Sequence, residues 1–183
     1  KDGIRMEVKE GYKNSEVGLI PKEWNLEAIG KLCCPSKSRI DPKVTEIQYK
    51  CVELEHISQE TGRLLGYSIS NESASQKSLF TKGDILFGKL RPYLRKYLLA
   101  EFDGACSTEI WVLQAGRAIL NQFLFYIVQS SRFLEAANLS TGTKMPRAEW
   151  KTVSETTIAL PEIPEQQAIA EVLTDTDNLI QAL

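Results

Sequence analysis

The chain has 183 residues, 43% of them hydrophobic, and a formal net charge of −2, which fits one globular domain with a sizeable core. No stretch approaches the ~18 consecutive apolar residues of a membrane span, and the charged N-terminus lacks the apolar segment of a signal peptide. We therefore expect a cytoplasmic protein with no membrane contact. Four cysteines without C-x-x-C spacing predict reduced, mostly buried thiols: Cys33, Cys34, Cys51 and Cys106.

Charge is distributed unevenly along the chain. From Trp150 onward one lysine is set against six acidic residues, a net charge of −5, so the first 149 residues carry +3. The strongest basic cluster lies in this body, where residues 82–97 hold five Lys or Arg against one Asp. The acidic C-terminal part and the mildly basic first 149 residues are expected to have different functions.

The first 32 residues carry few signals. Residues 1–18 are polar, with no sustained period, and are expected to form an arm on the surface. The apolar residues that follow fit either a segment docked on the core or a strand. The docked segment would bury Trp24, Ile29 and Leu32. The strand would place on one face Trp24, Leu26 and Ala28.

The next stretch alternates predicted loops and strands. Residues 33–42 have loop composition, and Lys37 and Arg39 lie there beside two serines. These two cations could contact phosphate, although a solvated loop is the commoner outcome. Strands are predicted over 49–57 and 78–80, on either side of an exposed polar excursion, 64–76.

The stretch 83–96 is the most informative in the chain. The turn pair Gly83-Asp84 precedes three apolar residues, which predicts a short buried strand. Cations follow at 89, 91, 95 and 96, around a proline and Tyr93. A cluster of cations beside an aromatic ring that can stack suits a polyanion, and a solvated charged face is the alternative.

Two further strands are predicted at 97–100 and 105–113, separated by an Asp-Gly turn. Because strands follow one another without the long helices of a βαβ pattern, the sheet should be mixed or antiparallel. Helical spacing of apolar residues then predicts helices at 119–130 and 131–139, with Ser130 or Ser131 as the N-cap of the second.

A second cationic loop lies at 140–147. Its glycine amides, threonine hydroxyls, Lys144 and Arg147 could hold phosphate oxygens, since such donors supply most contacts to a nucleic-acid backbone. An ordinary loop between a helix and a strand is the alternative. Residues 150–160 are predicted to return to a strand.

The last element is a predicted helix that opens at 161–167, where proline and glutamate suit a helix N-terminus. Apolar residues then recur at steps of three and four, and the chain stops while this stripe is still running. We expect a truncated helix or one that pairs with another helix. The stripe consists of Ile169, Val172, Leu173, Leu179, Ile180 and Leu183.

These elements predict an α+β fold. A mixed, largely antiparallel β-sheet domain with flanking helices would occupy residues 1–162, and the start of a long coiled-coil-type helix would occupy 163–183.

Catalytic motifs are weak. The sequence has no G-x-x-x-x-G-K-[ST], G-x-G-x-x-G or H-E-x-x-H motif. A metal site would need the single histidine, His56, with Cys51 or scattered carboxylates, at spacing that metal sites do not use. A hydrolase would need Ser107, His56 and either Asp103 or Glu109, without the usual nucleophile motif. Both interpretations are much weaker than binding.

Four separated motifs, in order, resemble the specificity subunit of type I restriction-modification systems, as does the opening over residues 11–24. The motifs are Gly83-Asp84-Ile85-Leu86-Phe87-Gly88-Lys89-Leu90-Arg91-Pro92-Tyr93-Leu94-Arg95-Lys96, Phe102-Asp103-Gly104-Ala105-Cys106-Ser107-Thr108-Glu109, Gly142-Thr143-Lys144-Met145-Pro146-Arg147 and Leu160-Pro161-Glu162-Ile163-Pro164-Glu165-Gln166-Gln167-Ala168-Ile169-Ala170.

The resemblance implies a target recognition domain followed by the beginning of a spacer helix. In that family two such domains, separated by an antiparallel coiled coil, read two halves of a split site on double-stranded DNA. The subunit is not an enzyme and holds no cofactor. It recruits a methyltransferase subunit, which uses S-adenosylmethionine, and a restriction subunit, which uses ATP and Mg²⁺. A chain of this size would be a half subunit or a fragment, able to pair with a second copy or a second recognition domain.

The predicted DNA-contacting residues are Lys89, Arg91, Arg95, Lys144 and Arg147, with Tyr93, Lys37 and Arg39 less certain. Some of them could instead brace the recognition loops, and Arg91 could pair with Asp84 or Glu109. The polar loop 62–76 is a plausible carrier of base readout. Two alternatives remain open: the recognition end of a single-chain restriction-methylation enzyme, and a dimerisation module that does not bind DNA.

Overall fold

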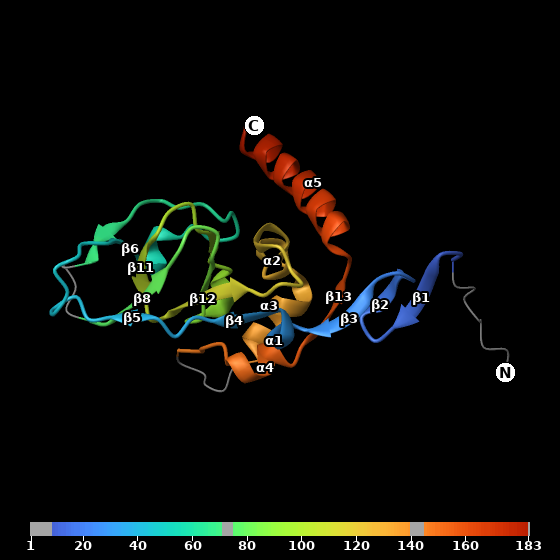
Figure 1. Ribbon diagram of the computed structural model, residues 1–183, viewed down its shortest axis with the longest axis horizontal. Helices are drawn as coiled ribbons and strands as arrows, with labels where there is room; N and C mark the ends of the chain where they lie inside the picture. Colours follow the sequence, from blue (N-terminus) through green and yellow to red (C-terminus); the bar gives the residue numbers. More distant parts are fainter. Residues whose placement is uncertain (1–8, 71–74, 140–144, 183) are drawn as a thin grey trace.

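The computed structural model describes residues 9–70, 75–139 and 145–182. Within these ranges the chain is elongated, with its largest sheet at one end and a small hairpin at the other (Figure 1). One strand pair is parallel and the other pairs are antiparallel, so the predicted α+β fold with a mixed, largely antiparallel sheet is confirmed.

The strands of the described residues form four sheets. The five-stranded sheet has the order β5 (Arg39–Ile40), β8 (Lys77–Phe80), β11 (Gly104–Ser107), β6 (Lys50–Val52) and β7 (Ser68–Ile69). The four-stranded sheet has the order β10 (Tyr97–Leu99), β9 (Ile85–Gly88), β12 (Ile110–Ala115) and β4 (Cys33–Pro35). The two-stranded sheets join β1 (Tyr12–Ser15) to β2 (Gly18–Pro21) and β3 (Asn25–Ala28) to β13 (Thr157–Leu160).

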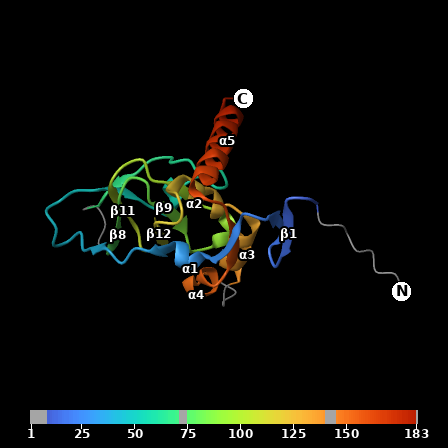
Figure 2. The same ribbon diagram turned by 45° about the vertical axis from the view of Figure 1, so that its right-hand side comes forward.

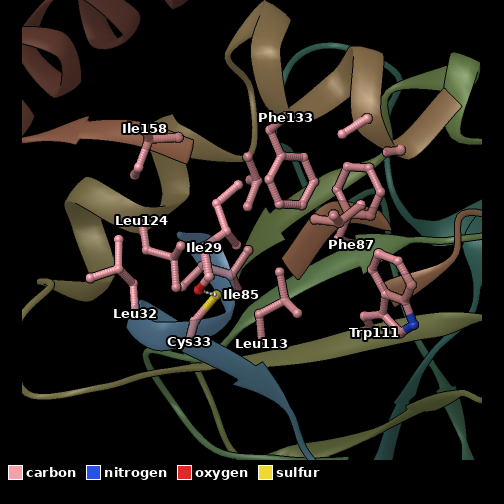
Figure 3. Packing of buried hydrophobic residues seen from close by; sticks show 14 of the residues in the cluster. Ile29, Leu32, Cys33, Ile85, Phe87, Trp111, Leu113, Leu124, Phe133 and Ile158 are labelled. Carbon is pink, nitrogen blue, oxygen red and sulfur yellow. Dashed lines mark hydrogen bonds between the residues drawn. The ribbon is translucent and has the colours of Figure 1, made fainter. Parts of the chain in front are cut away.

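The central strands β9 and β12 are covered on both faces. Ile85 and Phe87 of β9 point into one core, whereas Leu86, between them, belongs to a second core on the opposite face. In the first core, Phe133 lies at 5.0 Å from the ring of Phe87 (Figure 3). Because successive side chains of a strand alternate, an uninterrupted apolar run can supply both cores at once.

The helices complete the first core. They are α1 (Ile29–Leu32), α2 (Asn121–Ile127), α3 (Ser131–Asn138), α4 (Trp150–Ser154) and α5 (Ile163–Gln181), with the 3-10 turns η1 (Leu54–His56) and η3 (Pro92–Leu94). Ser130 caps α3 by accepting a hydrogen bond from the backbone N–H of Phe133, which confirms one of the two predicted caps. None of the described helices combines the length and apolar character that crossing a membrane requires.

Hydrogen bonds near its start attach the terminal helix α5 to the rest of the domain. Gln166, fully buried near its start, accepts a hydrogen bond from the backbone N–H of Leu120 and donates to the carbonyls of Ala118 and Pro161, each at 2.9 Å. Further along, the Tyr126 hydroxyl bonds Thr174 and Asp177 at 3.0 Å. Beyond this base the helix projects away from the sheets (Figures 1 and 2).

Near the N-terminus the structure differs from the expected arm. Residues 12–21 form the β1–β2 hairpin, with Gly11 and Gly18 in the positive-φ region that glycine tolerates best. Residues 1–8 of the expected arm lie outside the described residues. For the segment that follows, both expectations hold in part: residues 25–28 are strand β3, and Ile29 and Leu32 of α1 are buried.

Two sheet assignments were wrong. The expected loop 33–42 contains strands β4 and β5, because β12 and β8 offer them open edges. Pro35 fits there since an edge strand can do without one N–H. The single strand expected over 105–113 is two strands in different sheets, β11 and β12, separated by a turn at residues 108–109.

Two further elements begin or end differently from the prediction. Residues 150–154 form α4 rather than strand, because its short turn places Val153 completely inside the first core. Only residues 157–160 are strand, as β13. The strand expected over 49–57 ends at Val52, where Glu53 and His56 form a reciprocal capping box around η1.

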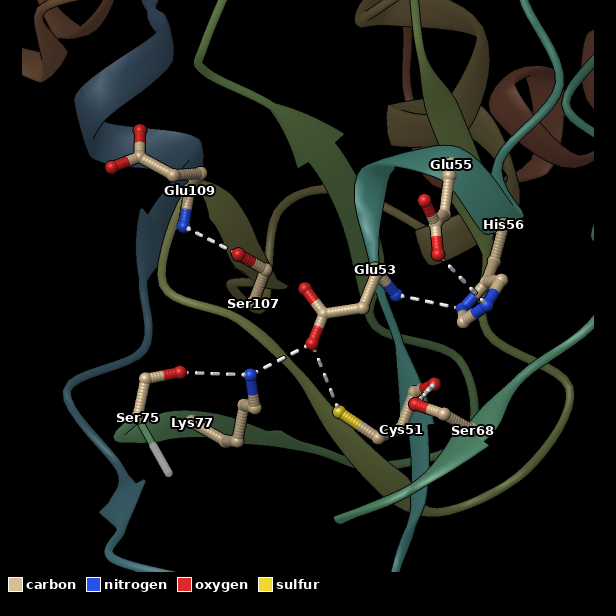
Figure 4. Close-up of polar contacts among 9 residues, drawn as sticks. All are labelled: Cys51, Glu53, Glu55, His56, Ser68, Ser75, Lys77, Ser107 and Glu109. Atoms are coloured by element: carbon tan, nitrogen blue, oxygen red, sulfur yellow. Dashed lines mark hydrogen bonds and ion pairs between the residues drawn. The ribbon is translucent and has the colours of Figure 1, made fainter. Parts of the chain in front are cut away.

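A buried polar cluster lies against the five-stranded sheet (Figure 4). The Lys77 ammonium, on a side chain only 4% exposed, donates to Glu53 Oε1 at 2.7 Å and to Ser75 Oγ at 3.1 Å. The Cys51 thiol donates to the same Glu53 oxygen at 3.6 Å. Glu53 thus neutralises a lysine that burial would otherwise leave at a high free-energy cost.

This pair generates a stability prediction. Replacing Glu53 with alanine leaves the Lys77 ammonium buried without a carboxylate, and we expect a loss of about 3 kcal/mol in the free energy of unfolding, measured with urea. The matched control is Glu55→Ala, because that side chain is 82% exposed and should cost within about 0.5 kcal/mol. Equal losses in the two variants would contradict the assignment.

Candidate nucleic-acid interface

The predicted cation cluster follows the buried strand β9 and turns sharply. Arg91 and Arg95 flank η3 with φ values of 52° and 48°, which non-glycine residues rarely adopt. Pro92 is buried beneath the turn, and Tyr93 between the two arginines is 54% exposed. The side chains of Arg91 and Tyr93 are therefore exposed on a turn that the buried Pro92 anchors to the domain.

The two cationic loops lie side by side. The backbone N–H of Arg91 donates to the Pro146 carbonyl at 2.8 Å, and that of Ala148 donates to the Lys89 carbonyl at 2.8 Å. These bonds bring Arg147 beside Leu90 as a bridge between loops far apart in sequence. The predicted Lys144 lies outside the described residues.

Glu109 has a different partner from the one expected. Its carboxylate accepts bonds from Arg147 Nε and Nη2 at 2.9 and 3.3 Å, and this hydrogen-bonded pair raises the pKa of the Arg147 guanidinium. Asp84 instead accepts bonds from the Thr81 backbone N–H and hydroxyl. Neither carboxylate pairs with Arg91, which has no ion-pair partner among the described residues.

Three predicted cations meet at one hollow. The hollow measures about 580 Å³ and lies where β4, the residues leading into β5, and β12 adjoin. Lys37, Arg39 and Lys89 line it together with two tryptophans, Trp111 and Trp150, whose rings lie edge to face at 5.4 Å. Among the described residues, its lining contains no carboxylate and none of the three cations forms an ion pair. We call this feature the cationic hollow.

Other hollows on the described surface have a different electrostatic character. Carboxylates line each of four of them, including Glu101 and Asp177 beside α5, Glu27 beside Lys31, and Glu135 beside Arg95. An anion approaching those hollows meets negative charge as well as positive. The described lining of the cationic hollow offers positive charge alone, which favours a polyanion.

Arg95 is not brought to the cationic hollow. It forms an ion pair with Glu60 at 3.2 Å and lines a separate hollow at α3. The structure thus groups Lys37, Arg39 and Lys89, places Arg147 and Arg91 on the adjoining loops, and sets Arg95 apart.

Three residues of this site were not predicted from the sequence: Trp111, Trp150 and Ser78, which also lines the cationic hollow. Trp150 follows the second cationic loop closely, much as Tyr93 follows Lys89 in the first, and that recurrence was an available signal. Ser78 carried none, because its role depends on the pairing of β5 with β8.

The alternative catalytic sites do not assemble. Ser107 Oγ accepts a bond from the Glu109 backbone N–H, whereas His56 Nδ1 accepts one from the Glu53 backbone N–H, so the two side chains serve separate turns (Figure 4). Among the described residues, no three of His, Cys, Asp and Glu are grouped so that they could hold a metal ion.

The predicted partner stripe on α5 is largely exposed. Val172, Leu179 and Ile180 are 65%, 70% and 64% exposed, and Leu173 is 38% exposed. Ile169 is partly buried against the first core, and Leu183 lies outside the described residues. The helix turns Gln166, Ala170 and Thr174 toward the domain, so Ile169 and Leu173 lie beside that face, whereas Val172 and Leu179 lie farther round the helix and are more exposed.

Comparison with known proteins gives a consistent result. Residues 21–183 match the family model described as "Type I restriction modification DNA specificity domain". The chain is 30% identical over 165 residues to the type I restriction enzyme EcoDI specificity subunit of Escherichia coli, covering 86% of this chain and 36% of that protein. It is 26% identical to the MjaVIII specificity subunit of Methanocaldococcus jannaschii, covering 93% of this chain and 43% of that protein.

Solved structures agree with these relatives. The HsdS subunit from Thermoanaerobacter tengcongensis matches with a TM-score of 0.77 and 26% identity, over 89% of this chain and 44% of that one. A structure from a study of complex assembly in the type I R-M system matches with a TM-score of 0.75, over 88% of this chain and 44% of that one. The chain spans less than half the length of each of these four proteins. It belongs to the type I restriction-modification DNA specificity domain family.

Proposed function

We propose that this chain is a target recognition domain that binds one half of a bipartite site on double-stranded DNA, and that the cationic hollow faces the duplex. The observation that carries the proposal is the grouping of Lys37, Arg39 and Lys89 around a hollow whose described lining holds no carboxylate. Phosphate neutralisation needs several cations on one surface, and ion pairing would reduce their effect. Family membership supports the same conclusion.

The partners and cofactors follow from the family as part of this proposal. The domain docks a methyltransferase subunit and a restriction subunit in the cytoplasm and is itself not an enzyme. S-adenosylmethionine, ATP and Mg²⁺ are then bound by those subunits and not by this chain. The overall charge of −2 limits affinity for DNA, so binding by the chain alone is weak and sensitive to salt.

The exposed stripe on α5 supports a second contact. A row of apolar residues at three- and four-residue spacing is the pattern by which helices pair in coiled coils. We propose that α5 pairs with a helix of a second copy or of a second recognition domain, which places two recognition domains on one DNA molecule.

The main test is binding to a pool of random duplexes at low and moderate salt, with and without the methyltransferase subunit, followed by fluorescence anisotropy. We expect selective binding that weakens as salt rises and strengthens with the subunit. Lys37→Gln and Lys89→Gln should each reduce the slope of log affinity against log salt by about 1. The control is Lys31→Gln, since Lys31 lies beside Glu27 in another hollow. A folded protein that binds no duplex under either condition would rule out the proposal.

Cys34 provides an internal footprint of the cationic hollow. It is exposed and lines the hollow, whereas the other three thiols are buried. Burial raises the pKa of Cys33 to about 12 and of Cys51 to about 11, and it also raises the pKa of Cys106. At pH 8, which lies below these values, the buried thiols stay protonated and unreactive.

We therefore expect a disulfide reagent to label one thiol per folded chain at pH 8, and the labelling rate to fall severalfold when duplex DNA is bound. Cys34→Ser should abolish the rapid labelling. Labelling at the same rate with and without saturating DNA would show that the duplex binds elsewhere.

Helix pairing can be tested by sedimentation. If the exposed stripe of α5 forms the contact, Val172→Lys combined with Leu179→Lys should convert a concentration-dependent dimer into a monomer, because it buries two ammonium groups in the seam. The control adds the same two charges off the stripe, as Gln167→Lys with Gln181→Lys, and should leave association intact. If both double variants weakened association equally, the added net charge, and not the apolar stripe, would account for the effect.

A further inference from the structure

Within the cationic hollow, Arg39 is held differently from the two lysines. It lies on the edge strand β5, directly opposite Ser78 of β8. Its Nη1 donates a hydrogen bond to the Ser78 hydroxyl, and Ser78 is only 2% exposed on a strand within the sheet. One side of the guanidinium is thereby fixed to the rigid part of the fold.

The anchored guanidinium retains donors for a ligand. A guanidinium carries five N–H donors in a planar fork, and Ser78 uses one of them. Among the described residues no carboxylate forms an ion pair with Arg39, and the residue is exposed at the hollow. A fork already restrained in orientation loses little further freedom when it binds, so it favours a ligand with two acceptors at fixed spacing.

Lys37 and Lys89 lack such an anchor. No side-chain hydrogen bond of either ammonium is found within the described ranges, although the Lys89 backbone is bonded on both sides, to Glu109 and Ala148. An ammonium on a flexible stem acts as a point charge without directional preference. That behaviour suits phosphate oxygens, which position a protein on DNA but carry no sequence information.

We propose that Arg39, positioned by Ser78, reads the edge of a guanine in the major groove, while Lys37 and Lys89 hold the flanking phosphates. Guanine presents two acceptors, O6 and N7, at the spacing that an arginine fork matches. Trp111 and Trp150 supply an apolar part of the wall beside these cations. This inference rests on the proposed function and assigns separate roles within it.

The test compares affinity for the duplex selected from the random pool with affinity for unselected duplex, using the chain with the methyltransferase subunit. Arg39→Lys keeps the charge and removes the fork, so we expect discrimination to fall about tenfold or more while affinity for unselected duplex changes less than about twofold. Reselection with this variant should lose its preference at one G·C pair.

Two companion variants separate the roles. Ser78→Ala releases the anchor and should lower discrimination about threefold without altering the salt slope, as expected for a positioning residue. Lys37→Gln should weaken binding to all duplexes alike and leave discrimination unchanged. Thermal melting of each variant verifies folding. Ser78→Thr retains the hydroxyl that accepts the bond from Arg39, so this variant should keep the discrimination that Ser78→Ala loses.

Two results would overturn the inference in different ways. If Arg39→Lys leaves discrimination unchanged, or weakens selected and unselected duplexes equally, Arg39 is another phosphate contact and the proposed function stands. If the unaltered chain with its subunit selects no duplex, the proposed function itself fails, and the role of Arg39 fails with it.

Discussion

The constraint on which the structure depends is the burial of strands β9 and β12 on both faces. Ile85, Phe87, Trp111 and Leu113 supply the core beneath the helices, while alternate residues of the same strands supply the core shared with the second sheet. Each large apolar side chain buried this way contributes about 1.5–3 kcal/mol. A slip of one residue in register would exchange the two cores, so the register is strongly fixed. The loop that begins at Lys89 therefore starts from a strand of fixed register, and the Lys89 backbone is bonded to Glu109 and Ala148.

The distribution of charge is a second consequence of the fold. The net charge of −2 is small, but the carboxylates are distributed unevenly over the surface. Glu53, Glu60 and Glu109 each neutralise one cation, those of Lys77, Arg95 and Arg147. No acidic residue of α5 is found in the described lining of the cationic hollow, and the helix projects away from the sheets (Figure 2). Local sign, rather than net charge, therefore governs what this surface attracts.

The parts of the fold that could be predicted are those in which local pattern and tertiary burial agree. The apolar run at 85–87 and the helical spacing in α2, α3 and α5 each fit one periodicity. Strands β4 and β5 could not be found, since two or three residues carry no period and their strand form depends on partners distant in sequence. In the same way α4 owes its helical turn to the pocket that receives Val153. The cations of the site could be identified in the sequence. Which three of them line one hollow could not, because that grouping depends on how the strands pair.

The buried amide of Gln166 fixes the direction in which the last helix leaves the domain. The 19 residues of α5 span about 28 Å at about 1.5 Å per residue, and the three bonds of Gln166 form its fulcrum. Measured from Gln166, the remaining 15 residues of α5 span about 22 Å, so a tilt of about 10° there would carry the far end about 4 Å, slightly more than the rise of about 3.4 Å between successive base pairs. Under the proposed function, in which α5 joins two recognition domains, one side-chain amide at the base of the helix would help to set how many base pairs lie between the two halves of the site.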